Sequence, residues 1–363
     1  MKILCFTPLN PYIKTPETGF AELLRKHGHE VMLVYTENEF GKIVKNDMII
    51  NFNPDVIFSM MEYSLPVAIH YNKIIKKPLY AHIECIPPWR TGLEPPKNYG
   101  LDLGHGIGII TDTVDGISMI PTYKRLLELF DTADYRTISQ ESWRYTFEDF
   151  TGKKLDAGVK YYTYDLTELK KYKGNYDIKY QVYTISRLVP IKRVHHIIMA
   201  LSLIRKPIRP VYALIGYGHL YKYIKDLAKL YGVEIVFYGN GKNGIKEKVI
   251  QESLFGIQIF SGMPIMEGAY YNKPTVTYGI PQTKEVFGDS VIYAVNNNIT
   301  SLKDNIEHLL LNKDKIELLG KKANDMILNN KTNIWDNDKY VYEVEKNLMQ
   351  AIKNFKIKND GED

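Results

Sequence analysis

Strand-like and helix-like segments alternate along most of the chain, and this alternation constrains the fold more than any other sequence feature. The pattern begins with a strand at 2–8, a helix at 19–27 and a strand at 30–35. It continues with strands at 55–60, 79–83 and 135–138, and with helices at 65–76 and 121–131. Such alternation predicts an α/β protein whose parallel sheets carry helices on both faces.

A second alternating series follows a polar stretch at 170–179, which we interpret as an interdomain linker. Its strands are expected at 181–186, 211–215, 234–238, 256–260 and 275–278, and its helices at 194–204, 220–231, 245–252 and 264–271. We therefore predict two doubly wound, Rossmann-like domains, residues 1–170 and 171–338. Because ligands of open α/β sheets bind beyond the carboxyl ends of the strands, the two domains are expected to face a cleft.

The tail of the chain is predicted to be helical and amphipathic at 301–329 and 339–355. In the last helix, apolar residues three or four positions apart form one stripe that includes Tyr340, Val344 and Leu348. We expect residues 339–363 to cross back onto the first domain, so that the stripe contacts residues numbered below 170. The alternative is packing on residues 180–300.

Composition and charge narrow the possible functions. No apolar run of 18 residues and no signal peptide are found, and Cys5 and Cys85 are too few for a disulfide framework or a cysteine zinc site, which predicts a cytoplasmic protein. Residues 1–168 carry 18 basic and 22 acidic side chains, whereas residues 169–363 carry 29 and 20. The basic second half is either a solvated lysine-rich surface or a site for an anion such as a nucleotide diphosphate. Dense basic runs with interleaved aromatics are missing, which argues against nucleic acid.

Two loops of the second half carry residues that could bind phosphate. Gly216 and Gly218 follow a strand and precede a helix, where glycines let the backbone approach a phosphate or simply make a tight turn. Arg187 and Lys192 follow another strand, where both cations could point into the cleft or lie on the surface. A third glycine at the dinucleotide-fold spacing is missing, because Tyr221 stands there.

A third loop leads into the helix expected at 264–271. Gly262 and Met263 precede this helix, and Glu267 is expected in its first turn. Free N–H groups at a helix start favour a phosphate or a sugar oxygen. Glu267 could accept hydrogen bonds from two ribose hydroxyls, or it could serve only as a cap or dipole partner.

In combination these segments resemble the nucleotide-binding domain of the retaining glycosyltransferases of family GT4, which have the GT-B fold. Four blocks match in order, at 183–200, 214–227 with 236–239, 262–274 and 275–288; the last has Glu285 at the acidic position of the family. The segment 23–31 resembles the family's first domain more loosely.

The resemblance implies a role for each matching residue. Arg187 and Lys192 would neutralise the diphosphate and the leaving group, Glu267 would bind the ribose, and the backbone at Gly262 and Met263 would hold the β-phosphate and the sugar. The remaining donor-side positions are Gly19, Gly216 and Tyr238. His82 and Glu84 would face the acceptor, although His82 could equally be a packed histidine at the end of a strand.

The chain departs from the family in the loop before Glu267. The family has two glutamates separated by seven residues, and the first falls at Ile259, which is apolar, with Gln258 beside it. No metal site is expected: Asp336 and Asp338 mimic a metal signature of another glycosyltransferase fold, but they are better placed to cap the last helix. No cofactor is expected either.

We therefore predict a metal-independent retaining glycosyltransferase that moves a sugar from a nucleotide-diphosphate sugar to a hydroxyl acceptor. The acceptor, a saccharide, a lipid-linked molecule or a small molecule, is expected near 87–116, so that peripheral membrane contact is compatible with the sequence. Two alternatives remain, a non-catalytic partner subunit of such an enzyme and an NAD-dependent oxidoreductase.

Overall fold

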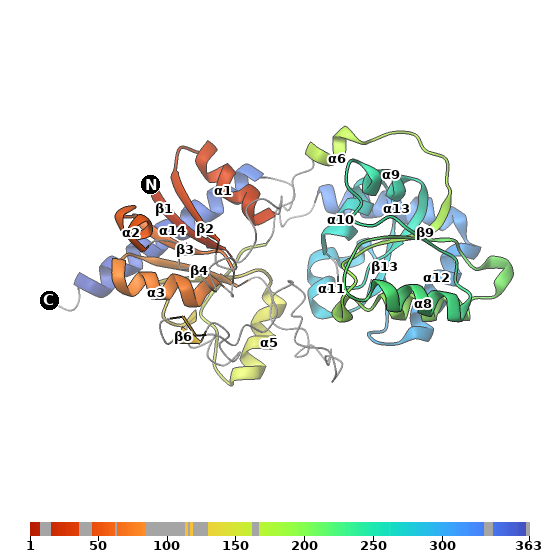
Figure 1. The fold of residues 1–363 in the computed structure, drawn as a ribbon, viewed down its shortest axis with the longest axis horizontal. Coiled ribbons are helices and arrows are strands. Elements are labelled where there is room, and N and C mark those ends of the chain that lie inside the picture. Colours follow the sequence, from red (N-terminus) through yellow and green to blue (C-terminus); the bar gives the residue numbers. More distant parts are fainter. Residues whose placement is uncertain are drawn as a thin grey trace. The chain divides into compact units, whose positions relative to one another are not determined.

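A computed structural model of the chain describes residues 1–7, 16–35, 46–61, 64–83, 113–114, 117–118, 130–161, 167–260, 262–329 and 337–360. These residues form two compact units (Figure 1). The N-terminal unit contains the described residues up to 161 together with 337–360, and the C-terminal unit contains those from 167 to 329. Within these ranges, no helix is both long and apolar enough to cross a membrane.

The N-terminal unit is built on a six-stranded parallel sheet of order β2-β1-β3-β4-β7-β8. Its strands are β1 (Lys2–Thr7), β2 (Glu30–Tyr35), β3 (Val56–Ser59), β4 (Leu79–Ile83), β7 (Tyr135–Ile138) and β8 (Gly158–Val159). Its helices are α1 (Pro16–Lys26), α2 (Asn46–Asn51), α3 (Leu65–Ile75), α5 (Glu141–Thr151) and α14 (Asn337–Asp360), and β5 (Thr113–Val114) and β6 (Ile117–Ser118) form a separate antiparallel pair. The central strands are continuous apolar runs because both faces of a parallel sheet are covered.

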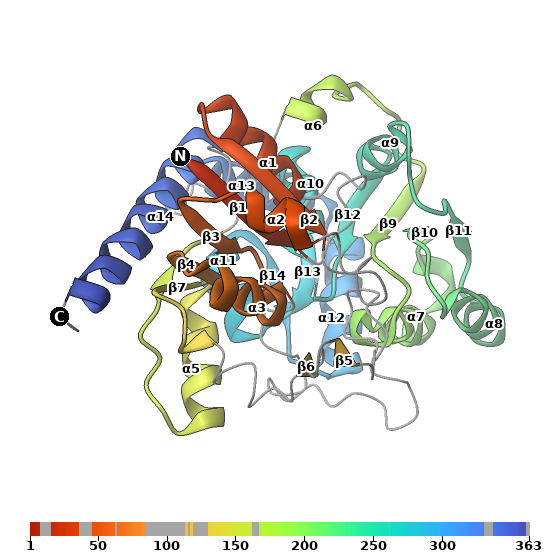
Figure 2. The ribbon, with the colours of Figure 1, turned by 60° about the vertical axis from the view of Figure 1, so that its left-hand side comes forward.

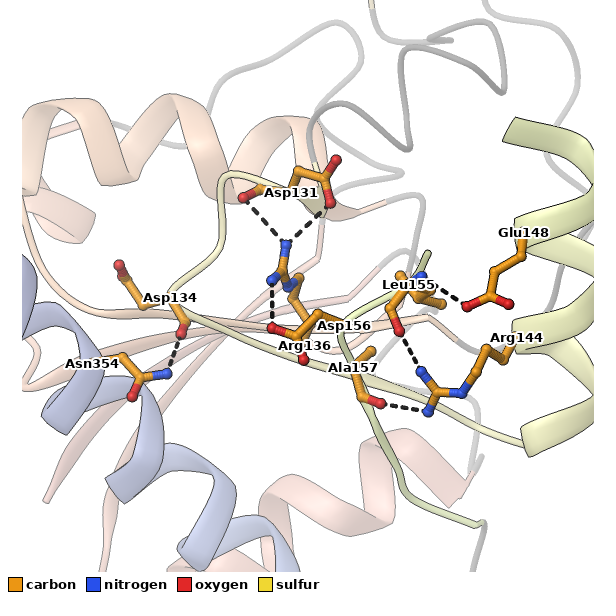
Figure 3. Close-up of polar contacts among 9 residues, drawn as sticks. All are labelled: Asp131, Asp134, Arg136, Arg144, Glu148, Leu155, Asp156, Ala157 and Asn354. Atoms are coloured by element: carbon orange, nitrogen blue, oxygen red, sulfur yellow. Dashed lines mark hydrogen bonds and ion pairs between the residues drawn. The ribbon is translucent and has the colours of Figure 1, made fainter. Parts of the chain in front are cut away.

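The last helix, α14, belongs to this unit although it is the last element of the chain (Figures 1 and 2). Val341, Val344 and Leu348 are fully buried in one core with residues of β1, β3 and β4. Tyr340 accepts a hydrogen bond from Lys160 at 2.5 Å. Near the other end of α14, Asn354 donates to the Asp134 carbonyl oxygen at 2.7 Å (Figure 3). The helix therefore contributes both apolar core residues and hydrogen bonds to the N-terminal unit.

The segment between α5 and β8 is held by two arginines (Figure 3). Arg144 on α5 donates to the carbonyl oxygens of Leu155 and Ala157, the latter at 2.6 Å. Arg136 on β7 pairs with Asp131 at 3.1 Å and Asp156 at 3.4 Å. These contacts tie the short edge strand β8 to the rest of the unit.

The C-terminal unit has its own six-stranded parallel sheet, of order β11-β10-β9-β12-β13-β14. Its strands are β9 (Tyr180–Ile185), β10 (Tyr212–Ile215), β11 (Ile235–Phe237), β12 (Ser253–Ile257), β13 (Thr275–Tyr278) and β14 (Ile292–Ala294). Its helices are α6 (Thr167–Lys171), α7 (Val194–Leu203), α8 (Tyr221–Tyr231), α9 (Ile245–Gln251), α10 (Gly262–Tyr270), α11 (Pro281–Phe287), α12 (Ile299–Leu311) and α13 (Lys313–Leu328). Both units are thus doubly wound α/β structures.

The polar stretch at 170–179 is not a linker, because it packs on the C-terminal unit. Gln251 Nε2 donates to the Tyr172 carbonyl oxygen at 2.8 Å, and Gly174 N donates to Gln251 Oε1 at 3.0 Å. Lys179 N donates to the Glu252 carbonyl oxygen at 2.8 Å. Its polar composition reflects exposure on the surface of one unit, and α6 before it also belongs to the C-terminal unit.

Candidate functional site

The strand order of the C-terminal sheet reverses between its two central strands, β9 and β12. The chain runs outward from β9 through β10 to β11 and then returns to place β12 on the other side of β9. Ligands of open α/β sheets bind beyond the carboxyl ends of the strands at such a switch point. The candidate site therefore surrounds the residues that follow Ile185 and Ile257.

Where β9 and β12 end, hydrogen bonds between side chains and backbone groups connect the two strands. Thr184 Oγ1 donates to the Ile257 carbonyl oxygen at 2.7 Å, and Ile185 N donates to Gln258 Oε1 at 3.2 Å. Gln258 is fully buried, and its Nε2 has no hydrogen-bond partner among the described residues. The amide of Gln258 thus bridges the two strands at the switch point.

Lys192 connects the loop after β9 to the loop after β12. It ends a short 3₁₀ turn, Pro190–Lys192, and its Nζ donates to the carbonyl oxygen of Phe260. Phe260 stands two residues before Gly262, the first residue of α10. The ammonium group therefore lies near a helix start whose first N–H groups have no intrahelical acceptor, an arrangement that attracts anions. Arg187, in the same loop as Lys192, is exposed.

Gly216 and Gly218 let the loop after β10 pack directly on the loop after β9. A Cβ at Gly216, whose φ is +154°, would lie 1.7 Å from the Ser186 carbonyl oxygen, and one at Gly218 would lie 2.5 Å from the Leu188 carbonyl oxygen. Leu188 N donates to the carbonyl oxygen of Tyr217, between the two glycines, at 3.0 Å. The two glycines thus have a packing role next to Arg187.

At α10, the structure changes the expected position of Glu267. The helix begins at Gly262 rather than near Pro264, so Glu267 is its sixth residue and lies in the second turn. A proline is compatible with any position of the first turn, because the N–H groups there need no helical acceptor. Gly262 and Met263 are exposed at the helix start, as a phosphate-binding backbone requires.

Glu267 is buried and forms an ion pair that the sequence does not suggest. Its Oε1 lies 2.7 Å from Lys246 Nζ on α9, which also lies 3.3 Å from Glu247. Burial lowers the pKa of Lys246, but the two carboxylates outweigh this effect and raise it above its ordinary value. The side chain of Glu267 is therefore held by Lys246, which excludes a simple helix-capping role. Lys246 and Glu267 are 21 positions apart on different helices, so sequence spacing carries no signal for this pair.

Three other residues named from the sequence have different surroundings in the C-terminal unit. Ile259 is 1% exposed in the core of the C-terminal unit, and β12 ends before it, at Ile257 rather than at 260. The Tyr238 hydroxyl contacts the hydroxyl of Tyr180, the first residue of β9, so that its side chain is held by the other end of that strand. Glu285 lies on α11 and is half-buried.

In the N-terminal unit, His82 is buried in β4 within a chain of polar contacts. Its Nδ1 lies 2.8 Å from Thr137 Oγ1, which is 2.7 Å from the Tyr80 hydroxyl, and Asn347 of α14 donates to that hydroxyl at 3.2 Å. Burial, with the charge of Lys160 added, holds the pKa of His82 well below its ordinary value. This histidine is therefore neutral at pH 7 and connected to α14.

The other N-terminal expectations are placed as follows. Gly19 lies within the first turn of α1, because the helix starts at Pro16, so it is not a loop glycine. Glu84 lies outside the described residues, as does Asp336. Asp338 contacts His27 at 3.6 Å, and no group of three or more candidate metal ligands occurs among the described residues.

Comparison with protein families identifies the C-terminal unit. Residues 166–332 match the family described as glycosyl transferases group 1. The C-terminal unit is a glycosyltransferase domain. No curated protein matches the chain.

Solved structures extend the likeness to both units. The glycosyltransferase domain and its N-terminal unit together resemble sucrose-phosphate synthase from Thermosynechococcus elongatus, with a TM-score of 0.74, 10% identity, and coverage of 95% of this chain and 97% of that one. HepE of Anabaena, solved with UDP-glucose, has a TM-score of 0.68 and 15% identity over 96% of this chain and 99% of that one. A glycosyltransferase from Rickettsia africae has a TM-score of 0.61 and 13% identity over 97% of this chain and 99% of that one. The predicted α/β fold of the GT-B class is confirmed.

Proposed function

We propose that the chain transfers a sugar from a nucleotide-diphosphate sugar to a hydroxyl acceptor with retention of configuration, as the resemblance to family GT4 implies. The observation that carries the proposal is the contact of Lys192 Nζ with the Phe260 carbonyl oxygen at the switch point, two residues before α10 begins. UDP and UDP-glucose are the ligands of the Anabaena HepE structures, so a UDP-sugar is the first donor to test.

In the proposed reaction, charged side chains and backbone N–H groups both stabilise the leaving group. A diphosphate leaving group gains negative charge as the bond to the sugar breaks, and preorganised cations and N–H groups stabilise that charge. Lys192 supplies a point charge, Arg187 supplies a guanidinium in the same loop, and the start of α10 supplies free N–H groups at Gly262 and Met263. These groups can act together without a metal ion. The departing phosphate can accept the proton of the acceptor hydroxyl, so no strong protein base is required.

On the acceptor side the proposal keeps His82 and Glu84. His82 is 2% exposed, so an acceptor can reach its neutral imidazole only after the residues that cover it have moved. The acceptor class, a saccharide, a lipid-linked molecule or a small molecule, and peripheral membrane contact remain part of the proposal.

The experiment combines binding and transfer with matched variants. The substitutions Arg187→Met and Lys192→Met each remove a charge-assisted contact to the leaving group, so we expect a loss of about 2–4 kcal/mol of transition-state stabilisation, roughly 30- to 1,000-fold in rate. Lys229→Met, an exposed lysine of α8, is the control and should leave the rate unchanged. Donor hydrolysis or transfer is measured at equal protein concentration. Turnover of Arg187→Met and Lys192→Met equal to that of the parent chain would remove the assignment.

A non-catalytic partner subunit is the second candidate. The buried, apolar Ile259 at the position of the family's first glutamate favours it, because this residue cannot bind a sugar hydroxyl. Such a subunit would bind UDP in calorimetry but would neither hydrolyse nor transfer the sugar when purified alone. Transfer by the isolated chain decides for the enzyme.

A further inference from the structure

Arg193, directly after Lys192, has a backbone conformation that its residue type does not favour. It lies between the 3₁₀ turn and α7 with φ 47° and ψ 36°, in the left-handed region. For a residue with a Cβ this conformation costs about 1–2 kcal/mol, and glycine avoids the cost. Residues that keep such backbone strain cluster at functional sites, so the arginine at this position points to an interaction of its side chain that offsets the strain.

The guanidinium of Arg193 lies over an aromatic ring of the candidate site. Its Cζ is 5.6 Å from the ring centroid of Phe260, which itself has a left-handed φ of 51°. The carbonyl oxygen of the same Phe260 accepts the hydrogen bond from Lys192. Two cations thus converge on one residue at the switch point, one at its backbone and one at its ring.

No anionic partner of Arg193 is found among the described residues. The side chain is half-buried and contacts the ring of Phe260, which offers no carboxylate to the hydrogen-bond donors of the guanidinium. Burial lowers the pKa of Arg193, and the Tyr278 phenol offsets this only in part. The neighbouring His195 and His196 have pKa values lowered to about 4, so they carry no charge at pH 7. Burial is the largest cause for both; Arg193 adds to it for His195, and His195 and then Arg193 add to it for His196. Charges that are partly removed from water are normally paired in proteins, but Phe260, Tyr278 and the two histidines beside Arg193 carry no negative charge.

We propose that Arg193 is a third cationic ligand of the donor, beyond Arg187 and Lys192, and that it binds an anionic oxygen of the diphosphate or of a carboxylate on the transferred sugar. The inference rests on the proposed function. A guanidinium offers several donors in one plane, which suits a phosphate or a carboxylate better than an ammonium group does.

The test measures binding of UDP, UDP-glucose and UDP-glucuronate by calorimetry to the full chain and to two variants. Arg193→Met removes the charge and retains the backbone strain, whereas Arg193→Gly removes both. Arg205→Met is the control, because Arg205 is 75% exposed and lies 4.0 Å from Glu307. We expect both Arg193 variants to lose about 10- to 100-fold in affinity for at least one ligand, as the loss of a charged hydrogen bond predicts, with a weaker salt dependence of that affinity and a melting temperature of Arg193→Gly no lower than that of the parent.

The three ligands identify the anion. Weaker binding of all three indicates the diphosphate, and weaker binding of UDP-glucuronate alone indicates a sugar carboxylate. Unchanged affinity for all three ligands in both variants overturns the inference. If the parent chain binds UDP, that result leaves the proposed function intact. If the parent chain binds none of the three ligands, the result contradicts the proposed function.

Discussion

Replacing Gly216 with alanine tests whether the glycine pair after β10 holds the C-terminal unit together. The new methyl group would lie 1.7 Å from the Ser186 carbonyl oxygen, about half of an ordinary carbon–oxygen contact. Relief requires the loop after β9 to move by more than 1 Å. That movement disrupts the hydrogen bond from Ser186 N to the Ile215 carbonyl oxygen, 2.9 Å, and the one from Leu188 N to Tyr217.

The magnitude follows from these parts. Two backbone hydrogen bonds contribute about 1 kcal/mol each, and a φ of +154° costs an alanine about 1–3 kcal/mol. We therefore expect Gly216→Ala to lower the free energy of unfolding by about 3–5 kcal/mol. The control is Gly232→Ala at the end of α8, where φ is +62° and the nearest atom to a new Cβ is 3.8 Å away. Left-handed strain alone predicts a loss of about 1–2 kcal/mol there.

Urea unfolding followed by circular dichroism measures both variants. A Gly216→Ala protein no less stable than Gly232→Ala would refute the packing argument. If it were as stable as the parent but failed to bind UDP, Gly216 would serve the ligand rather than the fold.

Three further outcomes are expected. Leu348→Ala should cost about 2–5 kcal/mol of stability, because Leu348 is fully buried between α14 and the first sheet, whereas Met349→Ala, 55% exposed, should change stability by less than about 0.5 kcal/mol; equal melting temperatures would contradict the packing of α14. Transfer should survive EDTA, because cations and helix N–H groups can stabilise the leaving group, and complete loss restored by manganese would contradict this. His195 and His196 have pKa values of about 4 in the folded protein, against the ordinary histidine value of 6.5 expected in the unfolded chain. Below pH 6.5 the unfolded chain therefore binds protons that the folded protein does not, so stability is retained above pH 6.5 and falls as the pH drops toward 4. After allowance for their partial exposure, the double substitution to Gln should make this fall shallower by about 1–2 kcal/mol in acid unfolding curves, and identical curves would contradict the assignment.

Sequence patterns predicted some strands to the residue and missed others for a physical reason. The strands β4 and β13 begin and end where the apolar runs do. The strand β12 was expected at 256–260 but spans Ser253–Ile257. Its bounds are set by register, since Ser253 pairs with Tyr180 of β9, and hydrophobicity continues past its end because Ile259 packs in the core.

The candidate site shows the same limit. Arg187, Lys192 and Gly262 follow strands or begin a helix, and such positions can be recognised along the chain. The partners that define their surroundings cannot, because Lys192 contacts a residue 68 positions away and Lys246 binds Glu267 across two helices. Only the folded C-terminal unit brings these groups together.

The place of α14 has a consequence for the order in which the protein folds during synthesis. The sheet of the N-terminal unit is translated by residue 159, but the helix that covers one of its faces begins at Asn337. At about 5–20 residues per second, the ribosome needs roughly 10–40 s to add the intervening chain. During that time the C-terminal unit is synthesised with all the residues of its own core. Ile3, Val56 and Phe58 remain without Val341 and Val344, which cover them in the folded protein. The second unit is therefore free to fold before the first, and the nascent N-terminal half carries an uncovered apolar face that a chaperone can bind until translation ends.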